Sequence, residues 1–156
     1  MKGNPQVIEL LNARLSEELA AISQYMVHAE MCANWGYARL AAALEDHAKQ
    51  EMRHAERLIA RVIFLEGVPS VARVGPIRLG QSVQDMVIND HHGELEAVHG
   101  YNEGIELCTR LADNGTRELL QEILQDEEGH VDWLEAQRDQ LEHMGVANYL
   151  ALQAQT

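Results

Sequence analysis

The sequence predicts an all-α protein: a bundle of four long helices followed by a short fifth helix. Hydrophobic residues make up 46% of the chain and aromatic residues only 4%, which favours helices packed through aliphatic side chains over a β-sandwich. Four stretches carry apolar residues at helical spacing, and Gly, Pro or Asn residues separate them. A chain of 156 residues can bury one core. We expect one domain over residues 1–156, with the bundle at about 5–143 and the last helix at about 146–153.

The first two helices are bounded by clear signals. Asn4 is a favourable N-cap and Pro5 suits the first helical position, so a helix begins here. Its apolar stripe runs from Ile8 to Cys32, and Asn-Trp-Gly at 34–36 ends it. A second stripe from Leu40 to Leu65 predicts the next helix.

The connection that follows is unusually long for a compact helical protein. Roughly 15 residues rich in Gly and Pro lie between Gly67 and Gly80. A crossover along the length of the bundle explains this segment, because the second and third helices then run parallel.

The second half of the chain repeats the helical pattern. Ser82 to Asp85 resembles a capping box, and an apolar stripe from Val83 to Cys108 follows it. Asn-Gly at 114–115 is predicted to separate this helix from the fourth, whose stripe runs from Leu120 to Leu141. After Gly145, residues 146–152 suit one or two further helical turns.

Charge and cysteine content exclude several classes of protein. The formal charge is −13, so nucleic acid is not an expected partner, whereas cations are attracted to such a surface. The sequence has no apolar run of membrane-spanning length, and its N-terminus has no apolar signal core. Cys32 and Cys108 lie on apolar helical positions, which indicates buried reduced thiols. We expect a cytoplasmic protein that does not contact membranes.

Residues of the metal-ligand type recur at one fixed spacing. Two Glu-x-x-His motifs lie 76 residues apart, and an upstream glutamate in each half follows the same spacing. A Glu and a His three residues apart share one face of a helix, so both can reach the same point. The matched residues of the two halves are Glu18, Glu51 and His54, and Glu94, Glu127 and His130. Four carboxylates and two imidazoles from four helices predict a two-metal site.

The position of these glutamates within apolar stripes supports the metal site. Glu18, for example, lies seven residues after Leu11 and seven before Tyr25. A carboxylate on a buried stripe is costly unless it is paired, protonated or bound to a cation. Salt bridges are a weaker explanation, because Arg14 and Arg53 lie off the stripes. Carboxylates mixed with imidazoles suit iron or manganese.

Other histidines and a third copy of the motif are assigned to different places. Glu96 and His99 form another Glu-x-x-His, but the residues at heptad spacing around them are polar, which indicates exposed surface. His47 lies near the core line and is either a core histidine or a neighbour of the site. The remaining histidines are predicted to lie on the surface: His28, His91, His92 and His143.

Two tyrosines, Tyr25 and Tyr101, lie one heptad beyond Glu18 and Glu94. Buried tyrosines at such positions commonly fill the core and give their hydroxyl to a carboxylate. A redox role is the second interpretation.

Taken with these motifs, the chain resembles the bacterioferritins, in the ferritin family. The resemblance spans nearly the whole chain and rests on the opening Met-Lys-Gly, Asn-Trp-Gly at 34–36, Phe-Leu-Glu-Gly at 64–67, Asp-Glu-Glu-Gly-His at 126–130 and Asn-Tyr-Leu at 148–150. It implies a ferritin-like bundle whose short last helix surrounds a pore in a hollow 24-subunit cage built from two-fold dimers.

The resemblance also implies a role for each candidate residue. Glu18 and Glu94 would be terminal ligands of one iron each, Glu51 and Glu127 would bridge the two irons, and His54 and His130 would complete the set, giving two non-haem irons per chain. Met52 would bind haem b, one per dimer. Spacing alone makes Met52 a methionine of the dimer contact. The family's haem pocket would be lined here by Leu19, Ile22, Ser23 and Met26.

The resemblance predicts iron storage and detoxification by a ferroxidase, which oxidises Fe(II) with O2 or peroxide and deposits a ferric mineral in the cage. A ferredoxin-type reductant would release the iron. Alternatives are a haem-binding cage and a di-metal peroxidase or catalase with little storage. The chain departs from the family at Asp46 and Gln50, where the best-known members carry a His and an Asp, so the resemblance does not extend to an inner iron site.

Overall fold

Helices make up most of the computed structural model, which describes residues 1–155. The five helices are α1 (Pro5–Asn34), α2 (Ala38–Phe64), α3 (Val83–Arg110), α4 (Asn114–Met144) and α5 (Val146–Gln153). No strand occurs among residues 1–155. The predicted all-α fold with a short fifth helix is confirmed.

The first hairpin forms where the sequence indicates. The Asn4 side chain accepts a hydrogen bond from the Gln6 amide at 2.8 Å, and Pro5 occupies the first turn of α1. The helix ends before Gly36, whose φ of 86° is a left-handed conformation that suits glycine. This turn reverses the chain, so α2 packs back along α1.

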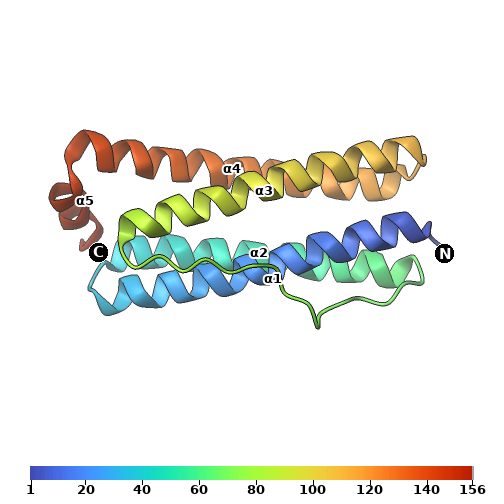
Figure 1. Ribbon diagram of the computed structural model, residues 1–156, viewed down its shortest axis with the longest axis horizontal. Coiled ribbons are helices and arrows are strands. Elements are labelled where there is room, and N and C mark those ends of the chain that lie inside the picture. The colour runs from blue at the N-terminus through green and yellow to red at the C-terminus, as the bar shows by residue number, and fades with distance from the viewer. Residues whose placement is uncertain (156) are drawn as a thin grey trace.

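The crossover gives the bundle its topology. Residues 65–82 contain no regular secondary structure and run along the bundle from the end of α2 to the start of α3 (Figure 1). As a result, α2 and α3 point in the same direction, and each is antiparallel to its hairpin partner, α1 or α4. The predicted parallel arrangement of the second and third helices is confirmed.

One prediction about the second hairpin is wrong. Asn114 and Gly115 do not separate the helices; they form the first turn of α4. The chain turns earlier, at Ala112, whose φ is 57°. Asp113 then caps α4, because its side chain accepts a hydrogen bond from the Thr116 amide at 3.0 Å.

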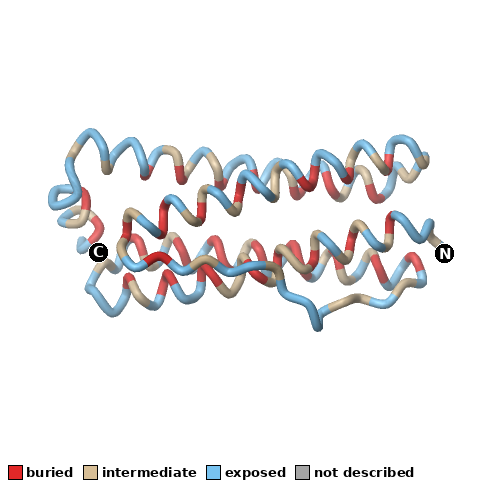
Figure 2. The backbone as a smooth tube through the Cα atoms, in the orientation of Figure 1, coloured by how far each residue is buried: buried red, intermediate tan, exposed pale blue. Residues whose placement is uncertain are grey.

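Two apolar clusters occupy the two halves of the bundle, and buried residues line its axis (Figure 2). The first cluster includes Leu15 and Leu58, and the second includes Leu44 and Tyr149 of α5. The Tyr149 hydroxyl donates to the Gln137 side chain of α4 at 2.8 Å, which ties the short helix to the bundle. No helix within residues 1–155 is long and apolar enough to cross a membrane.

A buried polar network attaches the crossover to the bundle. The Gly80 amide donates to Nε2 of His28 at 2.9 Å, so Nδ1 of that ring carries a proton and faces Asp90 at 2.9 Å. The Gln24 amide donates to the same carboxylate at 2.8 Å and accepts from the Arg78 amide at 2.9 Å. The buried side chains of the network, His28, Asp90 and Gln24, thereby each obtain a hydrogen-bond partner.

The network overturns the prediction that His28 lies on the surface. Its side chain is fully buried. The position lies off the apolar stripe of α1, and the crossover covers it. Helical periodicity does not report this burial, because the covering segment is more than fifty residues away in sequence.

Replacement of Asp90 by Ala should destabilise the fold. It removes the acceptor for both His28 and Gln24 and leaves two buried donors without a partner, which typically costs about 3 kcal/mol. Thermal unfolding of the metal-free protein, followed by circular dichroism, measures the effect. Asp132→Ala on the exposed face of α4 is the control and should change stability by less than about 0.5 kcal/mol. Equal midpoints for the two variants would contradict the structural role of Asp90.

Candidate metal centre

Six predicted residues from four helices meet in the middle of the bundle, between the two apolar clusters. α1 contributes Glu18, α3 contributes Glu94, and α2 and α4 each contribute a Glu-x-x-His pair. All six side chains are buried, and none is more than 4% exposed. The heptad phase of the sequence therefore leads to four carboxylates and two imidazoles in one enclosed space.

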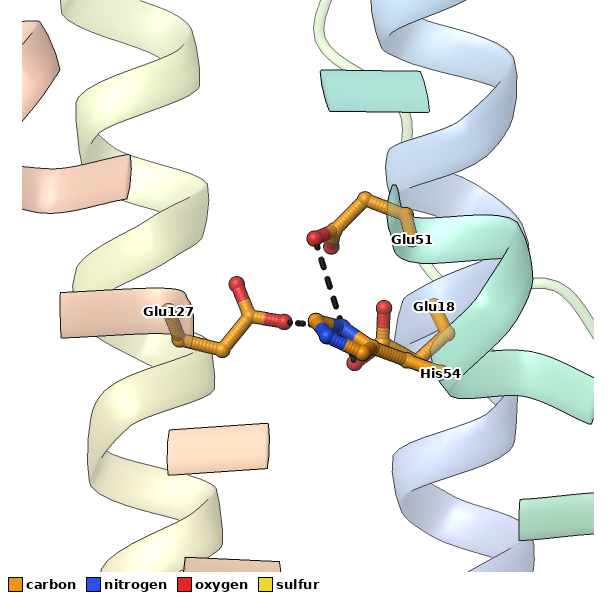
Figure 3. Close-up of side chains that lie close together, drawn as sticks. All are labelled: Glu18, Glu51, His54 and Glu127. Atoms are coloured by element: carbon orange, nitrogen blue, oxygen red, sulfur yellow. Dashed lines mark hydrogen bonds and ion pairs between the residues drawn. The ribbon is translucent and has the colours of Figure 1, made fainter. Parts of the chain in front are cut away.

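The first half of the centre surrounds the His54 ring. Its Nδ1 lies 3.0 Å from Oε1 of Glu127, 3.5 Å from Oε1 of Glu51 and 3.6 Å from Oε1 of Glu18. Figure 3 shows the ring between the carboxylates of Glu127 and Glu51. One potential ligand atom from each of these four residues lies within 4.8 Å of all the others.

The second half repeats this geometry around His130. Its Nδ1 lies 3.1 Å from Oε1 of Glu51, 3.1 Å from Oε1 of Glu94 and 3.3 Å from Oε2 of Glu127. Glu51 and Glu127 thus belong to both groups, whereas each group has one histidine and one glutamate of its own. The arrangement suits two neighbouring cations bridged by two shared carboxylates.

Polar groups around the centre orient its side chains. Nε2 of His54 lies 2.9 Å from Oδ2 of Asp126, and Nε2 of His130 lies 2.7 Å from Oε1 of Gln50. A proton on each Nε2 satisfies these contacts, and each Nδ1 faces the carboxylates, where it either donates a proton to them or is free to bind a cation.

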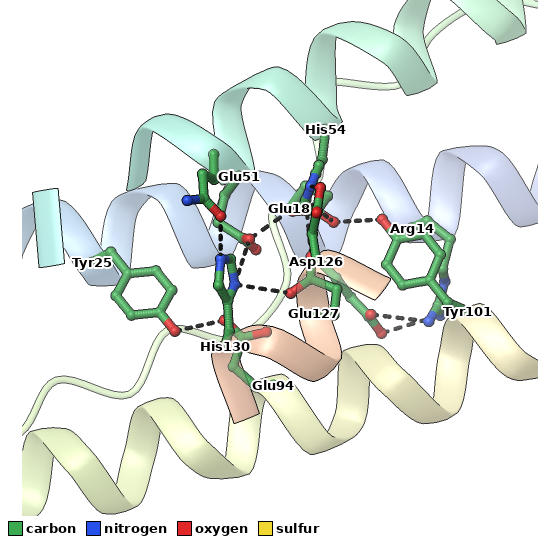
Figure 4. A network of polar contacts seen from close by, with 12 residues as sticks. Arg14, Glu18, Tyr25, Glu51, His54, Glu94, Tyr101, Asp126, Glu127 and His130 are labelled. Carbon is green, nitrogen blue, oxygen red and sulfur yellow. Dashed lines mark hydrogen bonds and ion pairs between the residues drawn. The ribbon is translucent and has the colours of Figure 1, made fainter. Parts of the chain in front are cut away.

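The two tyrosines hold the terminal glutamates. Tyr25 donates its hydroxyl hydrogen to Glu94 at 2.5 Å, and Tyr101 donates to Glu18 (Figure 4). Each tyrosine therefore binds the glutamate of the other half of the sequence. This hydrogen bonding confirms the core interpretation of both tyrosines.

Without cations the centre keeps protons. Burial is the main effect that raises the pKa of Glu18, and the negative charge of Glu51 is the second; together they raise it to about 8. Burial and the charges of Glu51 and Glu94 also raise the pKa of Glu127 well above its usual value. Burial lowers the pKa of His130, but hydrogen bonds with Glu127 and Glu51 outweigh it and raise the pKa to about 12. Four carboxylates this close do not all ionise beside only two imidazoles.

The same balance applies to the other two groups of the centre. Burial raises the pKa of Glu51, but hydrogen bonds with His130 and His54 outweigh it, so this pKa lies below its usual value. Burial lowers the pKa of His54, and hydrogen bonds with Glu127 and Glu18 reverse that effect and raise it.

Unpaired oxygens test whether the centre fits metal ions. Two buried carboxylate oxygens, Oε2 of Glu18 and Oε2 of Glu94, have neither a hydrogen bond nor an ion pair with residues 1–155. Buried acceptors normally have a partner, so these atoms are available to a cation. Oxygen donors with two imidazoles fit iron or manganese.

The remaining candidates fall outside this set. Glu96 and His99 are exposed, as predicted, and pair with surface neighbours. His92 and His143 are also exposed, whereas His91 is partly buried beside Glu135, so its prediction as a surface residue is only partly right. Met52 lies on α2 with 47% of its surface exposed.

His47 is a core histidine that also borders the centre, so both interpretations of this residue apply. Its ring stacks on that of His130, with centroids 4.4 Å apart and planes 19° apart, and Trp133 packs edge-on against it. Burial and the charge of His130 lower the pKa of His47 to about 4. The ring is therefore neutral near pH 7.

Two residues that touch the centre were not predicted as part of it: Asp126 and Gln50. The signal was present, because each immediately precedes a shared glutamate, and the same 76-residue spacing relates them. Sequence spacing does not reveal their contacts, because each reaches the histidine of the opposite half.

Comparisons with known proteins agree with this geometry. The family model for the Ferritin-like domain matches residues 8–144. A bacterioferritin of Brucella melitensis is 44% identical over 154 residues, covering 99% of this chain and 96% of the relative. A bacterioferritin of Streptomyces coelicolor is 41% identical, over 97% of this chain and 90% of the relative. A bacterioferritin of Rhodobacter capsulatus is 38% identical, over 99% of this chain and 96% of the relative.

The metal-free protein should lose stability as the pH rises from 6.5 to 8. With a pKa of about 8, native Glu18 keeps a proton that the unfolded chain releases above its ordinary value of 4.5. The raised pKa of His130 acts in the same direction above 6.5. Thermal midpoints across this range measure the slope, which should be shallower with saturating Co(II), because cations replace these protons.

Glu18→Gln is the control for this pH dependence. It keeps the hydrogen-bonding shape but cannot ionise, so its midpoint should change less with pH than that of the natural protein. A metal-free midpoint that stays constant or rises over the same range would contradict the protonation described above.

Proposed function

Because this chain belongs to the ferritin family, we propose that it stores and detoxifies iron, acting as a ferroxidase at the centre between its helices. The observation that carries this proposal is the pair of buried half-sites that share Glu51 and Glu127. Residues 1–156 would form one functional unit with one centre per chain.

Charge matching supports Fe(II) as the substrate. Two divalent ions carry as much positive charge as the four carboxylates carry negative charge, so a loaded centre with neutral imidazoles has no net charge. Oxidation to Fe(III) adds positive charge, which hard carboxylate ligands tolerate better than sulfur ligands do. Glu18 and Glu94 complete one position each, and the shared glutamates hold both ions together.

The proposed reaction moves two electrons at once. Two Fe(II) ions become two Fe(III) ions, and the electrons with two protons convert O2 to hydrogen peroxide or hydrogen peroxide to two waters. Paired metals make such a two-electron step possible without releasing radicals. Binding of the cations displaces the protons held on Glu18 and the histidines, so the centre itself is one source of protons.

A cavity supports direct access of substrates to the centre. It has a volume of about 420 Å³ and lies between α1 and α3 beside the crossover. Glu18, Glu51 and Glu94 line its inner part, and Glu17 and Glu103 are among its other lining residues. Carboxylates along this cavity would raise the local concentration of cations.

Haem b is the proposed second cofactor, one per two-fold dimer. Met52 is an exposed thioether on α2, and Met26 of α1 is 51% exposed. Exposed methionines fit a haem bound between two chains, with Met52 of each chain as its soft ligand and Leu19, Ile22, Ser23 and Met26 as its lining. The haem would carry electrons for reductive iron release, with a ferredoxin-type protein as their donor.

The proposed assembly is a cytoplasmic cage of 24 chains built from these dimers, with the ferric mineral inside. An anaerobic Fe(II) titration followed by an oxygen pulse tests storage directly. Rapid loss of Fe(II) with iron retained in solution supports the proposal. Peroxide disproportionation without iron retention would indicate a catalase, and slow oxidation with haem bound would indicate a haem-binding cage.

Glu94→Ala should slow Fe(II) oxidation by at least about tenfold while the helix content stays unchanged. The substitution removes a terminal ligand and relieves repulsion between buried carboxylates, so the fold need not suffer. Stopped-flow absorbance at saturating Fe(II) measures the rate. Glu96→Ala and His99→Ala, from the exposed copy of the motif, are the matched controls and should oxidise at the natural rate. If Glu94→Ala oxidised Fe(II) at the rate of the natural protein, the assignment of Glu94 as a metal ligand would be wrong.

Met52→Leu should abolish haem binding and leave Fe(II) oxidation intact. Leucine keeps the volume and apolar character, so the packing cost should stay below about 1.5 kcal/mol. Haem content per chain, measured after expression with excess haem, is the test, and the natural protein should give a low-spin spectrum. Equal low-spin haem in both proteins would make Met52 only a packing residue.

A further inference from the structure

Two residues at matched positions contact the centre but differ in charge. Gln50 directly precedes Glu51, and Asp126 directly precedes Glu127. Each side chain reaches the histidine of the opposite half, at 2.7 Å from His130 for Gln50 and at 2.9 Å from His54 for Asp126. One imidazole therefore donates to a neutral amide oxygen and the other to a carboxylate.

The acceptor matters because it acts through the ligating ring. A proton on Nε2 is shared with the acceptor, while Nδ1 faces the cation position. A carboxylate draws this proton more strongly than an amide does and makes the ring a better donor at Nδ1. Both acceptors select the same tautomer, so they differ in the electron density that they lend to the ring.

The surroundings of the two rings preserve this difference. The His130 ring is stacked on the His47 ring with a centroid distance of 4.4 Å, and Tyr25 lies at its edge with a centroid distance of 6.4 Å. Neither neighbour gives His130 a negative charge comparable with the one that Asp126 places beside His54. Asp126 is 52% exposed in its side chain, so solvent screens part of its effect on His54.

We propose that Gln50 and Asp126 make the two cation positions unequal, so that the position of Glu18 and His54 binds divalent metal more tightly than that of Glu94 and His130. Both are positioning residues that act through the histidines. Changes to such partners alter metal affinity by about 10- to 100-fold. Since Asp126 is half exposed, the lower end applies, about tenfold. This inference rests on the proposed function, because it concerns the same centre.

Its consequence is an order of filling. At limiting Fe(II) the position beside Asp126 fills first, and the pair needed for two-electron transfer forms only when the position beside Gln50 is also occupied. A chain that has bound one Fe(II) ion therefore does not carry out the two-electron step until a second ion binds.

Single-position variants, in which one histidine is removed so that only one position keeps its imidazole, separate this effect from repulsion between two bound cations. His130→Ala leaves the position of His54, and His54→Ala leaves the position of His130. Anaerobic Co(II) titrations, followed by visible absorption and calorimetry, give the affinity of each without any oxidation. The His130→Ala protein should bind Co(II) about tenfold more tightly.

The reciprocal substitutions are the decisive step. In the His130→Ala protein, Asp126→Asn should weaken Co(II) binding about tenfold, and in the His54→Ala protein, Gln50→Glu should strengthen it about tenfold. Asp126→Asn keeps the size and the hydrogen-bond acceptor, so it remains informative if Gln50→Glu folds poorly. Circular dichroism at 222 nm confirms that each protein is helical.

Equal affinities of the two single-position proteins, or affinities that neither substitution changes, would overturn the inference. The unaltered protein distinguishes this failure from failure of the proposed function. If it binds two Co(II) per chain and oxidises Fe(II), only the inequality is wrong. If it binds fewer than two, the two-cation centre itself is wrong.

Discussion

Four carboxylates enclosed in one apolar bundle are the constraint on which this structure depends. Burial of that much negative charge is unfavourable without compensation. Two imidazoles offset part of it, and protons on Glu18 and Glu127 offset more in the metal-free state. The interior is thereby poised to exchange protons for cations, since two divalent ions restore neutrality with every carboxylate ionised.

The packing isolates this charge and leaves one oxygen of each terminal glutamate, Oε2 of Glu18 and Oε2 of Glu94, without a hydrogen-bond partner. Apolar clusters occupy the bundle on both sides of the centre, and Tyr25 and Tyr101 each turn a hydroxyl toward a terminal glutamate. The crossover is held by a separate network around His28 and Asp90. Asp90 lies one helical turn before Glu94, so α3 contributes one residue to the network that holds the crossover and one to the metal centre.

The two halves of the chain build the centre by exchange. Each tyrosine binds the glutamate of the other half, and Asp126 and Gln50 each contact the histidine of the other half. Neither hairpin alone therefore contains a complete half-site. Because the two halves match so closely, a difference between equivalent positions is easy to identify. The amide of Gln50 and the carboxylate of Asp126, which precede the two shared glutamates, are such a difference.

The sequence alone determined the helices, the parallel arrangement across the crossover and the six residues that meet at the centre. These follow from local propensity and from the 3.6-residue period, which places residues seven apart on one face. For the same reason the sequence also predicted the Asn4 cap and distinguished the buried Glu94 from the exposed Glu96.

Contacts between distant segments were decided only by the tertiary structure. His28 is buried because the crossover covers it, and helical phase contains no information about a covering segment. The stacking of His47 on His130 and the crossed contacts of Gln50 and Asp126 depend on how the hairpins dock. Periodicity specifies which face of a helix is buried, but the partner of a side chain on that face depends on packing.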